Sequence, residues 1–409
     1  MNAAKHKYTI LQQICNLIPA YLVPQLASKH GIDKQVRTFS AWSHVVAMIF
    51  TQIAHSLSLN DIADTCRNHH GVLATIRNAT APSRNGLSHA NKIRSASMAE
   101  ELFWQVLSHI QQLHPKFGVG HKYSGLPRRF KRTIYSIDST TIQLVANCID
   151  WAKHRRRKAA AKCHMQLDLQ TFLPKFAIVK AADTHDSTEA YKLCANLQDG
   201  EIAVFDKAYV DFKHLESLDT RCVFWVTRAK TNMQYKVVGQ HTKKKGSIIC
   251  DEVIKLTIPK SKKEYPRTFR RVEAEVEIDK KHHTMVFITN NWKWSPNSIC
   301  DLYKSRWGVE VFFKQIKQTL QLADFLGHSE NAVRWQVWTA LLCYVLLRYI
   351  AHLGKWQGSF SRLFTLLRGV LFARLAMYNV LDACGKARGS PRMIAAPQQT
   401  FLTEFLTGG

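Results

Sequence analysis

Acidic residues are scarce in this chain of 409 residues. It has 57 lysines and arginines against 30 aspartates and glutamates, which gives a formal net charge of +27. Such an excess predicts a polyanionic partner, most simply nucleic acid, with a membrane surface as the alternative. The hydrophobic fraction of 46% excludes a disordered chain. At roughly 100–200 residues per domain, the length provides for two or three domains.

Paired cysteines and a leading apolar segment are also missing. The ten cysteines stand singly, without a C-x-x-C pair, so neither a zinc ribbon nor a dithiol redox motif is indicated. The first ten residues, MNAAKHKYTI, lack the apolar run of a signal peptide. We therefore expect a cytosolic protein with reduced thiols.

No long apolar run is free of charged residues. The longest run, residues 333–353, contains Arg334, Gln336 and Arg348, which are costly inside a bilayer. We therefore predict a buried helix here rather than a membrane span, and no membrane partner.

The first 117 residues favour helices. Residues 40–56 form an apolar run without Gly or Pro, a second helix is expected through Cys66, and helical periodicity resumes over residues 87–113 after a turn at 81–86. Helix, turn and helix suit a helix-turn-helix DNA reader, with Asn91 and Arg94 as candidates for base recognition. The alternative is a helix pair that only packs.

The central part changes to short apolar strands. Strands are expected at residues 133–138, 162–169, 176–182, 201–206 and 221–227, with helices at 186–197 and 209–218. The order βββαβαβ favours a ribonuclease-H-like α/β core over a Rossmann fold, which alternates from its beginning. Alternation within residues 230–286 predicts an inserted antiparallel sheet, and residue 297 begins a helix that is expected to continue to about 320.

These patterns predict an α/β fold, α+β overall, with five segments. They are a helical DNA-binding domain (1–117), the first part of the ribonuclease-H-like core (118–229), an inserted β domain (230–286), the last core strand and helices with Glu310 (287–355), and a helical C-terminal region (356–409).

Two of the few acidic residues end apolar strands. Asp138 follows Thr-Ile-Tyr-Ser-Ile, and Asp206 follows Ile-Ala-Val-Phe. A carboxylate at the end of a buried strand loses hydration unless a cation or hydrogen bonds offset the loss. On neighbouring strands the two would repel each other, and a divalent metal ion would relieve that repulsion. The alternative is that each aspartate merely caps a loop or helix.

A third acid lies on the later helix together with cations. Tyr303, Arg306, Glu310 and Lys317 are spaced by three, four and seven residues, which keeps them on one helical face. The face suits a site in which Glu310 binds metal while Arg306 and Lys317 hold phosphates. The alternative is an ordinary salt bridge between Arg306 and Glu310.

The spacing Y-(2)-R-(3)-E-(6)-K resembles the signature of the DDE transposases of bacterial insertion sequences, insertion-sequence family 4. Ile137-Asp138-Ser139-Thr140 is similar to the family's first-acid motif. Phe205 to Tyr209 resembles the second, D-x-G-Y, with Ala208 where glycine is usual. The resemblance covers residues 133–351.

The resemblance implies a transposase that binds terminal inverted repeats and target DNA as double strands, and that cleaves and joins DNA strands. Asp138, Asp206 and Glu310 would hold two Mg²⁺ or Mn²⁺ ions, and Tyr303, Arg306 and Lys317 would position phosphates. It also implies a homodimer in the synaptic complex and action at the nucleoid, in the cytoplasm. Two rival functions stay open: a DNA-binding regulator derived from a transposase without enzymatic activity, and a general Mg²⁺-dependent nuclease of this fold.

A dense basic run lies between the first two strands of the core. Arg155, Arg156, Arg157 and Lys158 follow one another there. We predict a loop that contacts the DNA backbone, and the alternative is a solvated loop.

Overall fold

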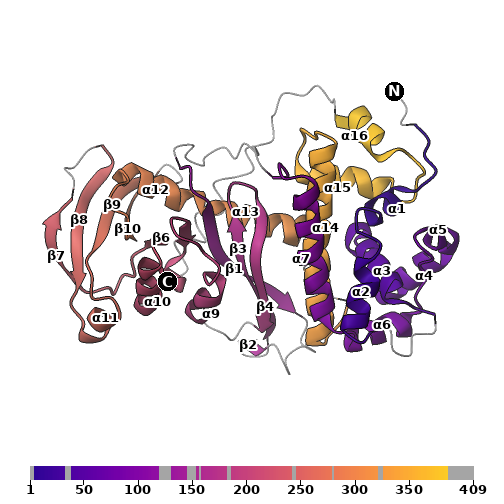
Figure 1. The fold of residues 1–409 in the computed structure, drawn as a ribbon, viewed down its shortest axis with the longest axis horizontal. Helices are drawn as coiled ribbons and strands as arrows, with labels where there is room; N and C mark the ends of the chain where they lie inside the picture. The colour runs from indigo at the N-terminus through magenta and orange to yellow at the C-terminus, as the bar shows by residue number, and fades with distance from the viewer. Residues whose placement is uncertain are drawn as a thin grey trace.

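The computed structural model describes residues 4–32, 38–118, 130–144, 153–155, 158–181, 186–241, 246–278, 281–320 and 326–385. The protein is elongated, with a large mixed sheet at one end and a helical body at the other (Figure 1). The long helices α7 (Ala96–Leu113) and α14 (Glu330–Leu353) pack against each other between the two.

The helical body combines the N-terminal helices with α14, α15 (Phe360–Gly369) and α16 (Met377–Gly385). Its remaining helices are α1 (Ile10–Cys15), α2 (Leu22–Lys29), α3 (Ala41–Ala54), α4 (Leu59–Asn68), α5 (His70–Thr75) and α6 (Arg84–Ile93). Serine side chains start several of them: Ser40, Ser58 and Ser83 each accept a hydrogen bond from the backbone N–H three residues later. These caps satisfy N–H groups that have no partner inside the helix.

The expected helix over residues 87–113 is interrupted. Arg94 is extended, with φ −72° and ψ 123°, and Ser95 caps the next helix. The interruption separates α6 from α7, and both helices pack against α14.

The sheet begins with antiparallel strands and continues with parallel ones. The core elements are β1 (Ile134–Leu144), β2 (Lys153–Arg155), β3 (Lys158–Asp168), β4 (Leu173–Ala181), α9 (Asp186–Leu193), β5 (Ile202–Phe205), α10 (Phe212–Thr220) and β6 (Phe224–Arg228). β3 lies antiparallel to β1 and β4, whereas β5 is parallel to both β1 and β6. The five main strands and two helices have the predicted order.

The inserted strands extend the same sheet. β7 (Tyr235–Gln240), β8 (Ile248–Leu256), β9 (Phe269–Ile278) and β10 (Lys281–Thr289) form an antiparallel series, with α11 (Pro259–Glu264) between β8 and β9. β10 pairs with β6, so the described part of the chain contains one ten-stranded mixed sheet. The predicted antiparallel insertion is therefore confirmed, and it continues the core sheet.

The helix expected from residue 297 to about 320 is interrupted at Arg306. It divides into α12 (Pro296–Ser305) and α13 (Trp307–Lys314), and a π-helical turn follows over Gln315–Thr319. Arg306 lies between the two helices. α13 packs on β1 and α12 packs on β6 and β10.

The two faces of the sheet carry different cores. Tyr135, Ile137 and Phe205 point toward the side covered by α9 and α10. Ile134, Ile142 and their neighbours on the opposite face belong to a larger core that continues into the helical body. The sheet and the N-terminal helices are thus joined by shared apolar packing.

α14 is the one described helix whose length and composition alone would allow it to cross a bilayer; the bent pair α3 and α4 would also qualify if taken as a single span. Of the most apolar 18-residue window of α14, 83% is buried inside the protein. The prediction of a buried helix is confirmed.

A buried histidine links α3, α6 and α14. The His44 side chain is fully buried, its Nε2–H donates to Asn91 Oδ1 at 2.8 Å, and its ring lies 4.3 Å from the Trp335 ring. Burial disfavours the imidazolium form and lowers the pKa of His44 to about 3.

This depressed pKa predicts a loss of stability in mild acid. The unfolded chain protonates His44 near pH 6.5, whereas the folded protein does so near pH 3, so the free energy of unfolding falls as pH decreases through that window. At pH 5 this protonation of the unfolded chain lowers the free energy of unfolding by about 2 kcal/mol. Urea unfolding of the wild type and of His44→Gln, which keeps a donor for Asn91 but does not titrate, should show a shallower pH dependence in the variant. Equal slopes would contradict the assignment.

Candidate active site

Asp138 and Asp206 lie beside each other on parallel strands. Ile137 of β1 is in register with Phe205 of β5, so the next residue of each strand is an aspartate. Asp138 does not end its strand as expected, because β1 continues to Leu144. Asp206 directly follows β5 and caps a 3₁₀ turn, since its Oδ1 accepts from the N–H of Ala208 at 3.1 Å.

The guanidinium of Arg306 lies between two of the acids. Its Nη1 donates to Asp138 Oδ2, and its Nη2 donates to Glu310 Oε1 at 2.5 Å. The Arg306 side chain is 4% exposed, while those of Asp138 and Glu310 are 16% and 29% exposed. The predicted alternative of an Arg306–Glu310 salt bridge is therefore present, but it is half of a bridge that also includes the first acid.

Arg306 lies between α12 and α13 and is attached to β1. Its carbonyl oxygen accepts from Ser136 Oγ at 3.3 Å. Burial opposes the charged form of Arg306, yet the surrounding carboxylates, Asp138 first, raise its pKa above the ordinary value. The residue is a permanent cation in this setting.

Tyr303 connects α12 to the second aspartate. Its hydroxyl donates to Asp206 Oδ2 at 3.4 Å, and its buried ring lies 5.1 Å from the ring of Phe287. Burial raises the pKa of Tyr303, so the phenol keeps the proton with which it donates. Tyr303 and Arg306 together thus contact all three acids.

Glu310 experiences the charge of both aspartates. Burial raises its pKa, Arg306 lowers it, and the negative charges of Asp138 and Asp206 raise it further. The three carboxylates are separated by 68 and 104 positions in the sequence, yet they share one electrostatic environment. We call Asp138, Asp206 and Glu310 the acid cluster.

Lys317 lies on the π-helical turn behind the cluster. Its Nζ donates to the carbonyl oxygen of Thr141 on β1 at 2.6 Å, and burial lowers its pKa. The four residues spaced along the later helix therefore all face β1 and β5, through contacts within the protein.

The chemistry of the cluster suits a divalent cation, but its present arrangement does not. Carboxylate oxygens are the ligands that Mg²⁺ and Mn²⁺ prefer. Within the part of the chain that is described, no group of three or more His, Cys, Asp or Glu side chains is placed to hold a metal ion. Arg306 instead donates to one oxygen of Asp138 and one oxygen of Glu310.

The expectation that Asn91 reads bases needs correction. Asn91 is 3% exposed, and its side chain accepts from His44. Arg94 donates to the carbonyl oxygens of Ser40 and Phe39. The spacing could have revealed this, because Leu87 and Asn91 are four residues apart and share the buried face of α6.

The basic run lies at the end of a strand pair. β2 pairs with the start of β3, and Arg155 is opposite Lys158. Arg156 and Arg157 lie outside the described residues. The prediction of a backbone-contacting loop therefore stays a prediction.

Comparison with known proteins places the acid cluster inside a recognised domain. Residues 129–346 match the family model described as the transposase DDE domain. Residues 6–76, which lie in the helical body, match a model described as a domain of unknown function (DUF4372).

Three curated relatives are similar in sequence. The chain is 28% identical over 299 residues to a putative transposase, y4zB, of Sinorhizobium fredii, a match that covers 72% of this chain and 79% of the relative. It is 28% identical over 236 residues to a probable transposase for insertion sequence element IS5377 of Geobacillus stearothermophilus, covering 57% and 60%. It is 26% identical over 211 residues to the transposase InsG for insertion sequence element IS4 of Escherichia coli, covering 48% and 46%.

Among solved structures, a piggyBac transposase synaptic complex with hairpin DNA aligns over 92% of this chain and 80% of that chain. The TM-score is 0.44 and the sequence identity is 10%. A likeness at that score supports no conclusion about this chain.

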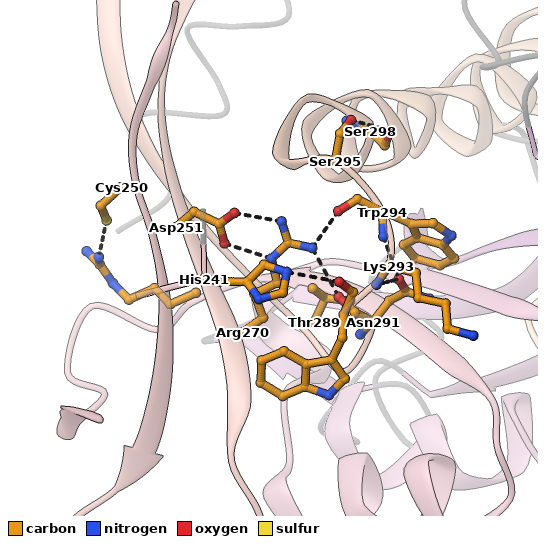
Figure 2. Close-up of polar contacts among 12 residues, drawn as sticks. His241, Cys250, Asp251, Arg270, Thr289, Asn291, Lys293, Trp294, Ser295 and Ser298 are labelled. Carbon is orange, nitrogen blue, oxygen red and sulfur yellow. Dashed lines mark hydrogen bonds and ion pairs between the residues drawn. The ribbon is translucent and has the colours of Figure 1, made fainter. Parts of the chain in front are cut away.

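A buried ion pair that the sequence patterns did not indicate positions α12. Arg270 of β9 donates through Nε and Nη2 to the two oxygens of Asp251 on β8, each at 2.7 Å (Figure 2). Its Nη1 donates to the carbonyl oxygens of Asn291 and Trp294, at 3.3 and 2.6 Å.

The loop that Arg270 contacts leads directly into α12. Asn291 Oδ1 accepts from the N–H groups of Lys293 and Trp294, and Ser295 caps the helix. The inserted strands thereby set the start of the helix that brings Tyr303 to Asp206.

Breaking this pair on one side should be strongly destabilising. Arg270→Met leaves Asp251 buried without its cation, and we expect the free energy of unfolding to fall by about 3–5 kcal/mol. The double variant Arg270→Met/Asp251→Leu should recover most of that loss, because no unpaired charge remains. Thermal and urea unfolding measure both changes.

The matched control is Asp64→Asn, which removes an ion pair with Arg67 whose side chains are 64% and 69% exposed. Exposed pairs contribute little, so a change within about 1 kcal/mol is expected. If Arg270→Met were no more destabilising than this control, the buried pair would have no such role.

Proposed function

This chain belongs to the DDE transposase family, whose domain model covers more than half of its length, and we propose that it moves an insertion sequence by acting on that element's terminal inverted repeats. The family catalyses DNA cleavage and strand transfer. The observation that carries the proposal is the acid cluster itself, in which Asp138, Asp206 and Glu310 surround one guanidinium.

The strand order supports a ribonuclease-H-like core. Three antiparallel strands are followed by two parallel ones, with α9 before β5 and α10 before β6. This order places the first and fourth main strands side by side, and with them the first two acids. The third acid comes from a helix packed on β1.

In the active state, Asp138, Asp206 and Glu310 would hold two Mg²⁺ or Mn²⁺ ions. Such ions would lower the pKa of the attacking water or 3′-hydroxyl group and neutralise charge on the phosphate that is cleaved. Arg306 and Lys317 hold phosphate oxygens beside the acids, where the planar guanidinium suits a bidentate contact. Tyr303 keeps Asp206 oriented through its hydroxyl group.

The helical body supplies the DNA-binding surface. The exposed side of α6 carries Asn85, Ser88, His89 and Lys92, and no acidic residue occurs between Asp64 and Glu100. A polar helix face without acids suits the major groove of a duplex. This face replaces Asn91 and Arg94 as the candidate for base recognition.

Segments 1–117 and 356–409 work together in this proposal, because α15 of the second segment packs on α3 of the first. Both segments also pack on α14, through α7 and α15. The core is made of segments 118–229 and 287–355, and segment 230–286 positions α12. Two copies bring two element ends together as a homodimer, at the nucleoid in the cytoplasm.

The charge of Asp206 provides the direct test of catalysis. Asp206→Asn removes one negative charge and one strong oxygen ligand while it keeps the side chain's shape. Mg²⁺-dependent cleavage of an end-repeat duplex should fall by several orders of magnitude, and binding to the same duplex should remain. The exposed Asp199→Asn is the matched control and should cleave like the wild type. Unchanged cleavage in Asp206→Asn would remove this residue from the site, and a wild type that binds without cleaving would favour the regulator.

Salt dependence separates backbone contacts from base recognition. Changing Arg155, Arg156, Arg157 and Lys158 to Ala should weaken binding to every duplex. It should also reduce the slope of log K against log salt concentration by about 2–4, because each phosphate contact contributes roughly 0.9. Competition titrations at several salt concentrations measure this slope. An unchanged slope would exclude the run from the DNA path.

The α6 face should behave differently in the same titrations. The triple change Asn85→Ala, His89→Ala and Lys92→Ala should weaken binding to end-repeat DNA more than binding to random DNA, because base contacts carry sequence preference. Lys213→Ala, at an exposed position on α10, is the control and should affect neither preference nor the salt slope. Equal losses on both duplexes would leave the α6 face as a charge contact only.

A further inference from the structure

Arg306 is the cation that lies between Asp138 and Glu310. Its two terminal nitrogens donate to Asp138 and Glu310, and the side chain is 4% exposed. We propose that Arg306 is a resident counter-cation that keeps the acid cluster closed to divalent metal until a DNA phosphate draws it away. This inference rests on the proposed metal site.

Competition follows from the oxygens that are shared. Arg306 donates to Asp138 Oδ2 and Glu310 Oε1 in charge-assisted hydrogen bonds. A divalent ion binds carboxylate oxygens at about 2.0–2.6 Å, so an ion on the same two carboxylates would lie close to the guanidinium. The two cations repel each other at that separation, and each therefore weakens the binding of the other.

The acid cluster needs a cation both without DNA and with DNA bound. Three carboxylates, two of them less than one third exposed, repel one another when no cation lies among them. Arg306 supplies that cation without DNA, and metal supplies it afterwards. The exchange avoids a state in which the acids are charged, close together and uncompensated.

A phosphate can replace the carboxylates as the partner of Arg306. A phosphate offers the guanidinium the same bidentate geometry that the two carboxylates provide. DNA that captures Arg306 would then free two metal-binding oxygens, and DNA and metal would each strengthen the binding of the other.

Metal binding in the absence of DNA tests the idea without using activity. Mn²⁺ binding by calorimetry and electron paramagnetic resonance is compared for the wild type and Arg306→Gln. We expect Arg306→Gln to bind Mn²⁺ about 10-fold more tightly, within the usual range of coupling between sites. It should also gain more thermal stability from Mn²⁺ than the wild type does. End-repeat DNA should tighten Mn²⁺ binding to the wild type and have little effect on the variant.

A second arginine provides a matched control. Arg271 also bridges two carboxylates, Glu252 at 2.9 Å and Glu273 at 2.6 Å, and its side chain is 11% exposed. Arg271→Gln should leave Mn²⁺ affinity unchanged, which separates a local exchange from a general change in charge. Arg306→Lys keeps the positive charge and should bind Mn²⁺ no more tightly than the wild type.

The outcomes distinguish this inference from the proposed function. If folded Arg306→Gln binds Mn²⁺ no more tightly than the wild type, Arg306 does not compete with metal and the inference is overturned. If Arg306→Gln does not fold, the wild type decides alone: Mn²⁺ affinity that is the same with and without DNA overturns the inference. If Glu310→Gln and Asp206→Asn leave Mn²⁺ binding to the DNA complex unchanged, the acid cluster is not the metal site and the proposed function fails instead.

Discussion

The placement of one buried positive charge determines how the site helices lie on the sheet. Arg306 contacts an acid from β1 and an acid from α13, and its own carbonyl oxygen accepts from Ser136. A buried guanidinium is costly unless carboxylates surround it, so without DNA these contacts favour the position of α12 and α13 in which Tyr303 and Glu310 lie beside the aspartates.

A second buried charge pair connects the inserted strands to the start of α12. Arg270 and Asp251 are both fully buried, and Arg270 also donates to the loop that precedes α12. β10 extends the core sheet by pairing with β6. The insertion therefore reaches the site through one continuous sheet and one helix, and a change in the inserted strands has a physical route to Tyr303.

The helical body has the same kind of continuity with the core. α14 packs against α7, α3 and β4, and its residues belong to the apolar cluster that also contains Ile134 and Ile142. His44 and Asn91, buried beneath α14, stabilise this contact. A DNA-binding surface on α6 would thus be carried by a body that shares its core with the catalytic sheet.

Local sequence patterns were sufficient for the order of strands and helices and for the neighbouring positions of Asp138 and Asp206. Both depend on periodicity within a few residues and on the rule that parallel strands present equivalent ends together. The i, i+4 spacing of Arg306 and Glu310 indicated their salt bridge as the alternative to a metal and phosphate site, and that salt bridge is present. The burial of Asn91 could also have been predicted, because Leu87 lies on the same helical face.

Other features were decided only by the tertiary structure. Asp138 completes the Arg306 bridge from 168 positions away, and Arg270 joins Asp251 from a different strand to carbonyl groups in a following loop. Neither pairing has a local pattern, because the energy of a buried charge depends on which distant groups replace its water. That replacement is settled when the strands and helices pack.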